Sequence, residues 1–299
     1  MSPGGTVHFV VPEGIDDPHR PSGGNRYDRR VIDALRDRGW TVAEHHEPVR
    51  AERVIVDGLL AVRDPDAWGG AIVLLHMPFA EAYPELEDAE RRLLRAARTI
   101  VTTSEWSRGW VITHHDLDPP RVIVAPPGVD PAPRATPSVG GGRLLSVGPV
   151  SRLKGHDVLV AALGQLDDLE WTCTWVGARD VDDKGADRIT YTGPLPAPPY
   201  SDADLLVSAS RHEAYGMAVT EALAQGVPAV VTDVGGHPEA LGGGGLLLPA
   251  DDPDTLAKEL RRWLTDPDAR ADLRAAAARR RASLRSWDDT ARDLEAVLR

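Results

Sequence analysis

The segment SASRHEAYGMAVTE, residues 208–221, is the stretch on which the expected fold depends. It follows an apolar run typical of a buried strand, and it continues into a segment typical of a helix, a tight turn and a further strand. Glu213 is therefore expected at the carboxyl edge of a parallel strand, where open α/β sheets bind ligands. Glu221 is expected one to two turns along the helix, and Gly216 allows close backbone approach. Each carboxylate is then able to contact a different part of an extended ligand. Two glutamates at this separation are, however, also common as ordinary charges of loops and helix surfaces.

The composition indicates two domains with real hydrophobic cores. The chain has 299 residues, of which 42% are hydrophobic. Its formal net charge is −12, which is the opposite of the balance typical of a nucleic-acid binder. We therefore expect no nucleic-acid partner.

The single cysteine, Cys173, excludes a disulfide framework and a cysteine metal site. It lies in an apolar run and is expected in a buried strand. The N-terminus lacks the pattern of a signal peptide, and no apolar run approaches the ~18 residues of a membrane span. We expect a soluble, cytoplasmic protein, with peripheral membrane contact left open and the oligomeric state unknown.

The first half of the chain begins with a Rossmann-like unit. A strand is expected at residues 6–12, a glycine-rich loop at 13–24 and an amphipathic helix at 25–38. Gly23 and Gly24 place bare backbone N–H groups at the helix N-terminus, which is a natural anion site. Alone this signal is weak, because paired glycines commonly only make a turn.

Polar residues follow the next expected strands of the first half. These strands lie at residues 54–60, 71–75, 99–103 and 121–125, with a helix at 84–98. Asp57, His76, Ser104 and Gly128 come at or just after their ends, so we expect them to gather at one sheet edge. Ser104 is also the expected N-cap of the next helix. A lone histidine is more commonly structural, but the end of a central strand favours a functional one.

A linker and a second α/β series follow. Residues 131–142 are rich in Pro and Gly and are expected to form the linker. Further strands are expected at residues 143–147, 171–176, 189–192, 204–208, 227–232 and 246–248. Helices are expected at residues 156–166, 253–264, 268–284 and 287–298.

The loops of the second half carry groups suited to a diphosphate. They contain Arg152, Lys154, Glu213, Gly235 and Gly236, and Lys supplies a point charge where Arg supplies a forked donor. If the edges of the two domains face each other, the active site is the cleft between them. The acidic run DVDD, residues 180–183, has no histidine nearby, and we favour an exposed loop over a metal site.

Several motifs together carry a family resemblance. They are LLSVGPVSRLKGHDVLVAAL at residues 144–163, SASRHEAYGMAVTEALAQGVPAVVTDVGGHPEAL at 208–241, PSGG at 21–24, VTTSEW at 101–106 and PPGVD at 126–130. The sequence resembles the family-4 type retaining glycosyltransferases, also called glycosyl transferases group 1. The resemblance implies an α/β GT-B fold, with two doubly wound Rossmann-like domains facing across a cleft. We expect an acceptor-side domain at residues 1–135, a nucleotide-sugar domain at 136–285 and a helix at 286–299 that packs back on the first domain.

The resemblance also implies roles for single residues. Glu213 lies by the hydroxyls of the donor sugar, Glu221 binds the nucleotide ribose, Lys154 holds the diphosphate and His76 contacts the sugar near the reacting centre. Glu213, His76 and Lys154 are thus the expected catalytic residues. The backbone around the start of the second-half helix faces the sugar or phosphate, and the glycine pair approaches the same diphosphate. The expected donor-binding set adds Gly23, Gly24, Arg152, Ala214, Tyr215, Gly216 and Met217. Asp57 and Ser104 are expected on the acceptor side.

One position departs from the family pattern. Pro149 stands where the family usually has the arginine that helps to neutralise the leaving group. Arg152, three residues further on, is the candidate to supply that charge.

The expected function is transfer of a sugar, most simply a hexose, from a nucleotide-diphosphate sugar to an acceptor hydroxyl with retention of anomeric configuration. No cofactor or metal is expected, because protein cations take the metal's place. The acceptor is expected to be a small molecule or saccharide. Two alternatives stay open, namely a catalytically silent homologue that binds a sugar nucleotide, and a nucleotide-sugar epimerase.

Overall fold

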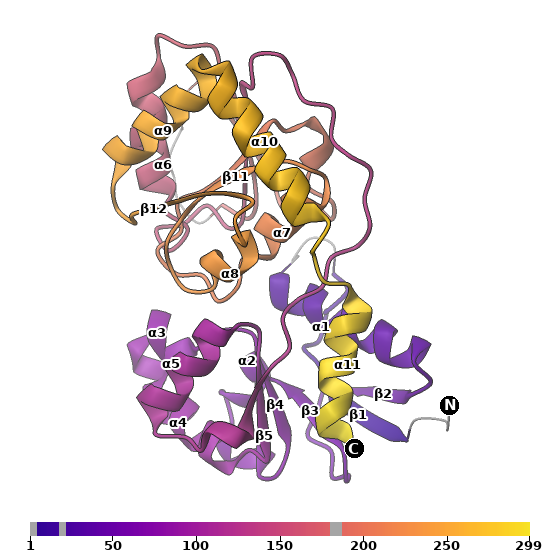
Figure 1. Ribbon diagram of the computed structural model, residues 1–299. Helices are drawn as coiled ribbons and strands as arrows, with labels where there is room; N and C mark the ends of the chain where they lie inside the picture. Colours follow the sequence, from indigo (N-terminus) through magenta and orange to yellow (C-terminus); the bar gives the residue numbers. More distant parts are fainter. Residues whose placement is uncertain (1–4, 18–21, 180–186) are drawn as a thin grey trace. The chain divides into compact units, whose positions relative to one another are not determined.

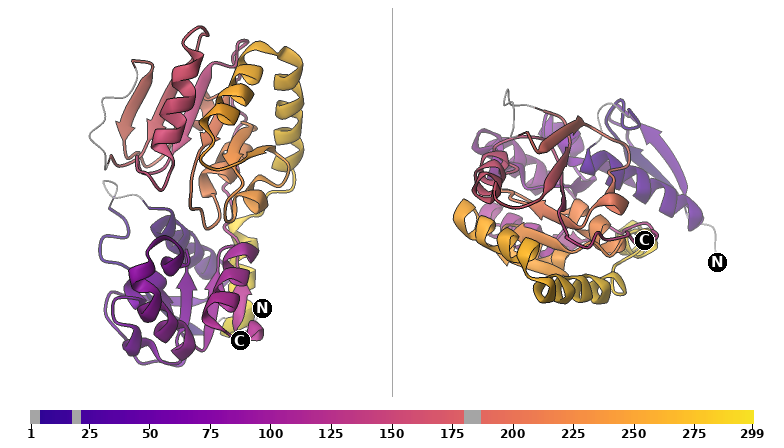
Figure 2. Two further views of the ribbon diagram at one scale, coloured as in Figure 1. Left: turned by 90° about the vertical axis from the view of Figure 1, so that its left-hand side faces the viewer. Right: turned by 90° about the horizontal axis from the view of Figure 1, so that it is seen from above.

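The computed structural model describes residues 5–17, 22–179 and 187–299, which form two compact units. Unit 1 contains the described residues up to 128 together with residues 285–299, and unit 2 contains those from 129 to 284. Each unit is an α/β structure with a parallel sheet and helices on both faces (Figures 1 and 2). The DVDD run lies outside the described residues.

Unit 1 is built on a six-stranded parallel sheet with the order β2-β1-β3-β4-β5-β6. Strand β2 is added on one side of β1, and strands β3 to β6 are added in turn on the other side, as in doubly wound folds. The strands are β1 (Thr6–Val10), β2 (Thr41–His45), β3 (Val54–Asp57), β4 (Ile72–Leu75), β5 (Thr99–Thr102) and β6 (Val122–Val124).

The helices of unit 1 are α1 (Gly23–Asp37), α2 (Gly58–Ala61), α3 (Phe79–Ala82), α4 (Glu87–Ala96), α5 (Glu105–His115) and α11 (Trp287–Leu298). Short 3-10 turns lie at η1 (Pro65–Trp68), η2 (Pro84–Leu86) and η3 (Pro119–Arg121).

The C-terminal helix α11 packs against α1 (Figure 1). One carboxylate fixes this contact, because Glu295 accepts hydrogen bonds from Trp40 Nε1 at 2.8 Å and from Arg38 Nη2 at 2.7 Å. The end of the chain is thus part of unit 1, although the intervening residues 129–284 belong to unit 2.

One expected strand of unit 1 has the wrong end, and one strand of unit 1 was not predicted. The strand expected at residues 54–60 ends at Asp57, whose side chain accepts a hydrogen bond from Leu60 N and caps α2. Strand β2 is missing from the sequence prediction. It is an edge strand, TVAEH, in which only Val42 is buried, so it lacks the apolar run that marks its neighbours.

Unit 2 has a second six-stranded parallel sheet, with the order β12-β11-β10-β7-β8-β9. Its strands are β7 (Arg143–Val147), β8 (Thr172–Val176), β9 (Ile189–Gly193), β10 (Leu205–Ser208), β11 (Ala229–Thr232) and β12 (Gly245–Leu248). The helices are α6 (His156–Leu163), α7 (Met217–Ala224), α8 (His237–Leu241), α9 (Pro253–Thr265) and α10 (Pro267–Arg281), with 3-10 turns η4 (Gly164–Leu166) and η5 (Tyr200–Asp202).

Both faces of the unit 2 sheet are buried. Leu144 packs into a core with residues of α6 and α9, whereas the next residue, Leu145, packs into a core with residues of α7 and α8. This alternation follows from the period of two in a β-strand. Cys173 is buried in β8, as expected. Among the described helices of both units, none is both long and apolar enough to cross a bilayer.

Asp204 anchors the start of β10. It is 1% exposed, and its carboxylate accepts hydrogen bonds from Ser138 N and Oγ and from three nitrogen atoms of Arg143. Burial raises the pKa of Asp204, but these hydrogen bonds outweigh burial and lower the pKa to about 2. The carboxylate therefore ties the linker and β7 to β10.

We predict that Asp204→Asn lowers the free energy of unfolding of unit 2 by roughly 2–4 kcal/mol, because the charged acceptor of Arg143 is lost from a buried position. Since the folded-state pKa is depressed, the wild-type contribution is present above the unfolded pKa of about 4 and is lost as the pH falls toward 2. Urea unfolding at pH 7 and pH 3 measures this. The exposed Asp202→Asn is the control, and equal losses for the two variants contradict the assignment.

Candidate functional site

The carboxyl edge of the unit 2 sheet brings together a lysine and a glutamate from two loops. Lys154 lies in the loop after β7 and Glu213 in the loop after β10, and these strands are neighbours. Lys154 Nζ is 2.8 Å from Glu213 Oε2, and both side chains are partly buried. Burial raises the pKa of Glu213, but the Lys154 ammonium outweighs it and holds the pKa below its usual value. Glu213 is therefore ionised at neutral pH.

Close backbone contacts fix these two loops. A methyl group on Gly155 would lie 1.8 Å from Ala209 O, and one on Gly235 would lie 1.8 Å from Glu213 O. Gly235 also has φ +54°, and the neighbouring Gly236 N donates to Glu213 O at 2.8 Å. Only glycine fits at either position, so the backbone that carries Glu213 has little freedom to move.

His237 completes this cluster, and the sequence analysis did not single it out. Its Nδ1 donates to Thr232 O at 2.9 Å, and its Nε2 lies 3.7 Å from Glu213 Oε2. Burial lowers the pKa of His237, so the ring is neutral at pH 7 and Nε2 is an acceptor. The histidine in the GGHPE segment was the available signal, but its partner is 24 residues away in sequence.

The start of α7 carries the other predicted residues of this region. Ala214 and the buried Tyr215 precede Gly216, which is the N-cap with φ +106°, and Met217 is the first helical residue. Glu221 lies one turn along α7 and accepts a hydrogen bond from Tyr200 Oη at 2.6 Å. Tyr200, on η5, is a site residue that the sequence analysis missed.

Arg152 contributes to this edge through its backbone. Its carbonyl accepts a hydrogen bond from Arg211 Nη1 at 2.5 Å, and its side chain is exposed. Arg211 also pairs with Asp157 and Asp251. Lys154 is thus the cation in contact with Glu213, and replacement of the missing arginine by Arg152 stays a prediction.

A second cluster lies at the carboxyl edge of the unit 1 sheet. His76 directly follows β4, and its Nε2 is 2.8 Å from Asp28 Oδ1 and 3.3 Å from Asp57 Oδ2. A methyl group on Gly24 would lie 3.0 Å from His76 Cδ2, so the glycine lets α1 approach the imidazole. The structure therefore brings Gly24, Asp57 and His76 together, and it adds Asp28, which the sequence analysis missed.

The charges of this cluster are strongly coupled. Burial raises the pKa of Asp28 to about 6, although the His76 imidazolium opposes this rise. Burial alone would lower the pKa of His76, but Asp28 and Asp57 together raise it to about 10. The pKa of Asp57 lies below its usual value, because hydrogen bonding to His76 outweighs burial. At neutral pH the imidazole is protonated, so Nε2 is a hydrogen-bond donor to both carboxylates.

The other predicted residues of unit 1 have structural contacts. The Ser104 side chain caps α5 by accepting from Ser107 N, as expected. A methyl group on Gly128 would lie 2.3 Å from Trp287 N, so this glycine lets the chain pass the start of α11. Gly23 is the first residue of α1, and Ser22 Oγ accepts from Asn25 N. The expected acceptor-side role of Ser104 stays a prediction.

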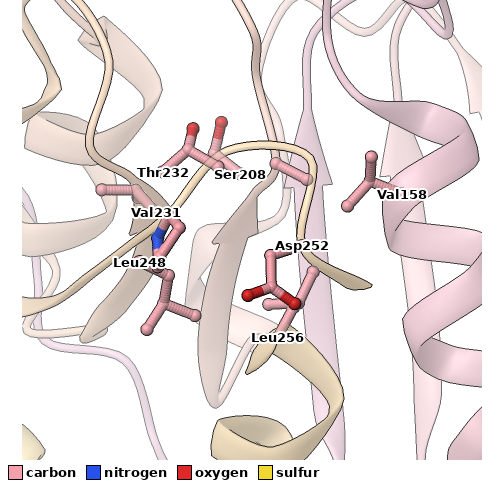
Figure 3. Close-up of a pocket in the computed structure, with 9 residues that line it drawn as sticks. Val158, Ser208, Val231, Thr232, Leu248, Asp252 and Leu256 are labelled. Carbon is pink, nitrogen blue, oxygen red and sulfur yellow. The ribbon is translucent and has the colours of Figure 1, made fainter. Parts of the chain in front are cut away.

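A small pocket lies at the ends of β10, β11 and β12 in unit 2, as Figure 3 shows. Its lining is largely apolar and includes Val158, Val231 and Leu256. The carboxylate of Asp252 is engaged there as the cap of α9, with Thr255 N at 2.9 Å. The pocket shares Thr232 with the His237 contact but contains none of the predicted site residues.

Comparison with known proteins identifies the family. Residues 141–266 match the family model described as glycosyl transferases group 1. This region belongs to the family. A D-inositol 3-phosphate glycosyltransferase of Paenarthrobacter aurescens is 33% identical over 237 residues, which are 69% of this chain and 58% of the relative. One of Salinispora arenicola is 34% identical over 245 residues, 67% of this chain and 54% of the relative. The chain thus spans little more than half the length of these group 1 relatives.

Solved structures share the fold. A sucrose-phosphate synthase of Thermosynechococcus elongatus has a TM-score of 0.78 at 20% identity, covering 98% of each chain. The HepE protein of Anabaena, in complex with UDP-glucose, has a TM-score of 0.77 at 16% identity, covering 98% of this chain and 99% of its own. The GT-B fold expected from the family resemblance is confirmed.

We predict that Gly216→Ala lowers the free energy of unfolding of the protein by roughly 1–3 kcal/mol more than Gly226→Ala. Both glycines flank α7 and have positive φ, +106° and +75°. Only at Gly216 would the methyl group meet a neighbour, His237 Cδ2 at 2.9 Å, whereas nothing lies within 4 Å at Gly226. Urea unfolding compares the two variants. Equal losses would mean that backbone strain alone matters and that His237 is not held tightly.

Proposed function

We propose that the protein is a glycosyltransferase that moves a hexosyl group from a nucleotide-diphosphate sugar to an acceptor hydroxyl with retention of configuration. The observation that carries this proposal is the Lys154–Glu213 ion pair beside His237. It lies at the carboxyl edge of a doubly wound sheet, inside the region that matches the group 1 family. A cation, an ionised carboxylate and the backbone amides of a helix N-terminus are groups suited to a sugar diphosphate.

The proposed leaving group is the nucleoside diphosphate. The bond between the anomeric carbon and the phosphate oxygen breaks, and negative charge develops on that oxygen. Lys154 and the N-terminal amides of α7 around Gly216 and Met217 stabilise this charge, with Arg152 as the further cation. These protein groups supply the positive charge, so we propose that the transfer needs no divalent metal.

The new bond forms on the same face of the sugar. The acceptor hydroxyl attacks the anomeric carbon as the diphosphate departs, and its proton moves to the departing phosphate oxygen. Glu213 binds the sugar hydroxyls, and its charge favours the oxocarbenium-like transition state. No protein nucleophile is needed, and configuration is retained.

Glu221 is the proposed partner of the nucleotide ribose. The hydrogen bond from Tyr200 Oη fixes the direction of its carboxylate. Tyr200 is 4% exposed, so its own position is set by the core. In unit 1, we propose that Gly23 and Gly24 approach the diphosphate, that His76 contacts the sugar and that Asp57 acts on the acceptor side.

The relatives suggest which compounds to test first. The HepE structure holds UDP-glucose, so uridine diphosphate sugars are the first candidate donors. The D-inositol 3-phosphate glycosyltransferases make a phosphorylated cyclitol the first candidate acceptor, followed by other small saccharides. We propose a cytoplasmic location, where such donors are made available.

We predict that one nucleoside diphosphate binds selectively in calorimetry without metal, across the uridine, guanosine, adenosine, thymidine and cytidine forms. Lys154→Ala should weaken this binding about 10- to 100-fold, because a charged hydrogen bond contributes about 1.5–3 kcal/mol. Lys258→Ala, at an exposed position on α9, is the matched control and should bind normally. Binding of none of the five compounds by the wild type would favour the silent homologue.

A second prediction separates catalysis from binding. Glu213→Gln should lower release of nucleoside diphosphate in the presence of acceptor by about 100-fold or more, since charge stabilisation at the transition state is lost. Affinity for the nucleoside diphosphate should be unchanged or higher, because Lys154 loses its competing partner. Unchanged turnover in this variant would contradict the proposal. An epimerase would instead yield an isomerised donor with no nucleoside diphosphate released at steady state.

A further inference from the structure

His76 is held by carboxylates from two different elements. Asp28 lies on α1 and Asp57 at the end of β3, and both face the same nitrogen, Nε2, at 2.8 and 3.3 Å. One N–H group is shared between two acceptors, so this nitrogen is directed into the protein and not toward a ligand. The two contacts fix the direction in which Nε2 points.

Further contacts hold the His76 imidazole in one orientation. Gly24 packs against Cδ2, and the Tyr27 ring meets the imidazole edge-on at a centroid distance of 5.2 Å. Thr103 Oγ1 donates to His76 O at 3.2 Å, which fixes the backbone at the end of β4. Within the described residues, the polar contacts of the His76 ring are made by Nε2, and the side chain is 15% exposed.

Burial of the Asp28 carboxylate has a free-energy cost that core packing alone does not explain. It is 0% exposed, and among the described residues its Oδ2 atom has no hydrogen-bond partner. A buried carboxylate that is only half satisfied is unfavourable, and an apolar residue of similar size would normally serve a core better. Within the described residues, Asp28 Oδ1 is hydrogen-bonded to His76 and the carboxylate lies beside Asp57, which contacts the same ring nitrogen, so the function of Asp28 is sought in that histidine.

We propose that Asp28 is a positioning residue, which holds His76 through Nε2–H so that Nδ1–H is presented to the ligand as a fixed, charged donor. This inference rests on the proposed function for the identity of the ligand, an oxygen atom of the donor sugar. Helix α1 then has two roles, because its glycine pair approaches the diphosphate and its Asp28 orients His76. The mechanism stated above does not use Asp28.

The charges near the imidazole agree with this arrangement. Asp28 on α1 and Asp57 on β3 are the ionisable groups in direct contact with Nε2, and together they raise the pKa of His76 to about 10 against the opposing effect of burial. Tyr27, on α1, meets the ring edge, and burial raises its pKa well above 10, so it stays neutral. Asp293 and Arg285, near α11, act on Tyr27 with opposite signs. The two groups that act directly on His76, Asp28 and Asp57, both favour the imidazolium.

The first test is the protonation state of His76 by imidazole ¹⁵N NMR, assigned with His76→Gln. In the wild type, both ring nitrogens of His76 should carry protons from pH 6 to pH 8. In Asp28→Asn, the pKa of His76 should fall by at least one unit. Asp33→Asn, on the exposed face of the same helix, is the matched control and should leave the pKa unchanged. A neutral His76 at pH 7 in the wild type overturns the proposal even if Asp28→Asn fails to fold.

The second test is kinetic. Asp28→Asn should lower kcat by about 10- to 100-fold, the scale known for loss of the carboxylate that orients a metal-bound histidine. Its alkaline activity limb should move to lower pH, and Asp33→Asn should behave as wild type. Affinity for the nucleoside diphosphate should stay within about twofold of wild type, since the Lys154 cluster belongs to unit 2. Loss of kcat with an unchanged pH profile indicates a merely structural role and overturns the proposal.

The outcomes distinguish this proposal from the proposed function. If the wild type neither binds a nucleotide nor transfers a sugar, the proposed function fails, while the NMR result still decides whether Asp28 holds His76 as an imidazolium. Asp28, Asp57 and His76 each offer a ligand atom, all within 4.8 Å of one another. Zn²⁺ alone is therefore added in the NMR experiment. Stoichiometric displacement of the His76 protons by zinc would replace the positioning role with a metal site.

Discussion

Parallel strand pairing is the constraint on which the rest of this structure depends. Every strand pair in both sheets is parallel, so each strand must be followed by a crossover that returns the chain to the opposite edge. The crossovers cover both faces, and the strands become buried on both sides, as Leu144 and Leu145 illustrate. Charged side chains are thereby kept out of central strands such as β4, β10 and β11, and they collect where these strands end. The positions of Asp57, His76, Lys154 and Glu213 follow from this rule.

The buried carboxylates at the two ends of the strands differ in how far they are satisfied. Asp204 precedes β10 at the amino edge, and its two oxygens accept five hydrogen bonds from Ser138 and Arg143. At the carboxyl edge, one oxygen of Asp28 lacks a hydrogen-bond partner among the described residues, whereas Glu213 pairs with Lys154 and also accepts a backbone hydrogen bond from Tyr215. Full satisfaction is what a structural role requires. The incomplete hydrogen bonding of Asp28 is costly, and it lies at the edge where α/β folds bind ligands.

The sequence predicted those parts of the fold and site that depend on local pattern. Apolar runs located the buried strands, and Lys154 and Glu213 were located in loops that follow such strands, whereas the pairing of β7 with β10 was not predicted. Strand β2 was missed because an edge strand needs only one buried side chain, and α8 because five residues carry no helical period. Asp28, His237 and Tyr200 were missed for a different reason. Each is defined by a contact with a residue 21 to 48 positions away, and no spacing rule within one sequence marks such a pair.

The ion pair between Lys154 and Glu213 has a consequence for the order of events in the proposed reaction. Without ligand, the Nζ atom of Lys154 is 2.8 Å from Glu213 Oε2. A diphosphate that takes up Lys154 removes the counter-charge of a partly buried carboxylate, and the free energy of that carboxylate then rises. Sugar hydroxyls are the donors that can satisfy Glu213 in its place. A nucleotide that carries the sugar thus compensates both partners, whereas a nucleoside diphosphate compensates only the lysine. Recognition of phosphate and of sugar is coupled through one interaction, which favours the intact donor over the product that must leave.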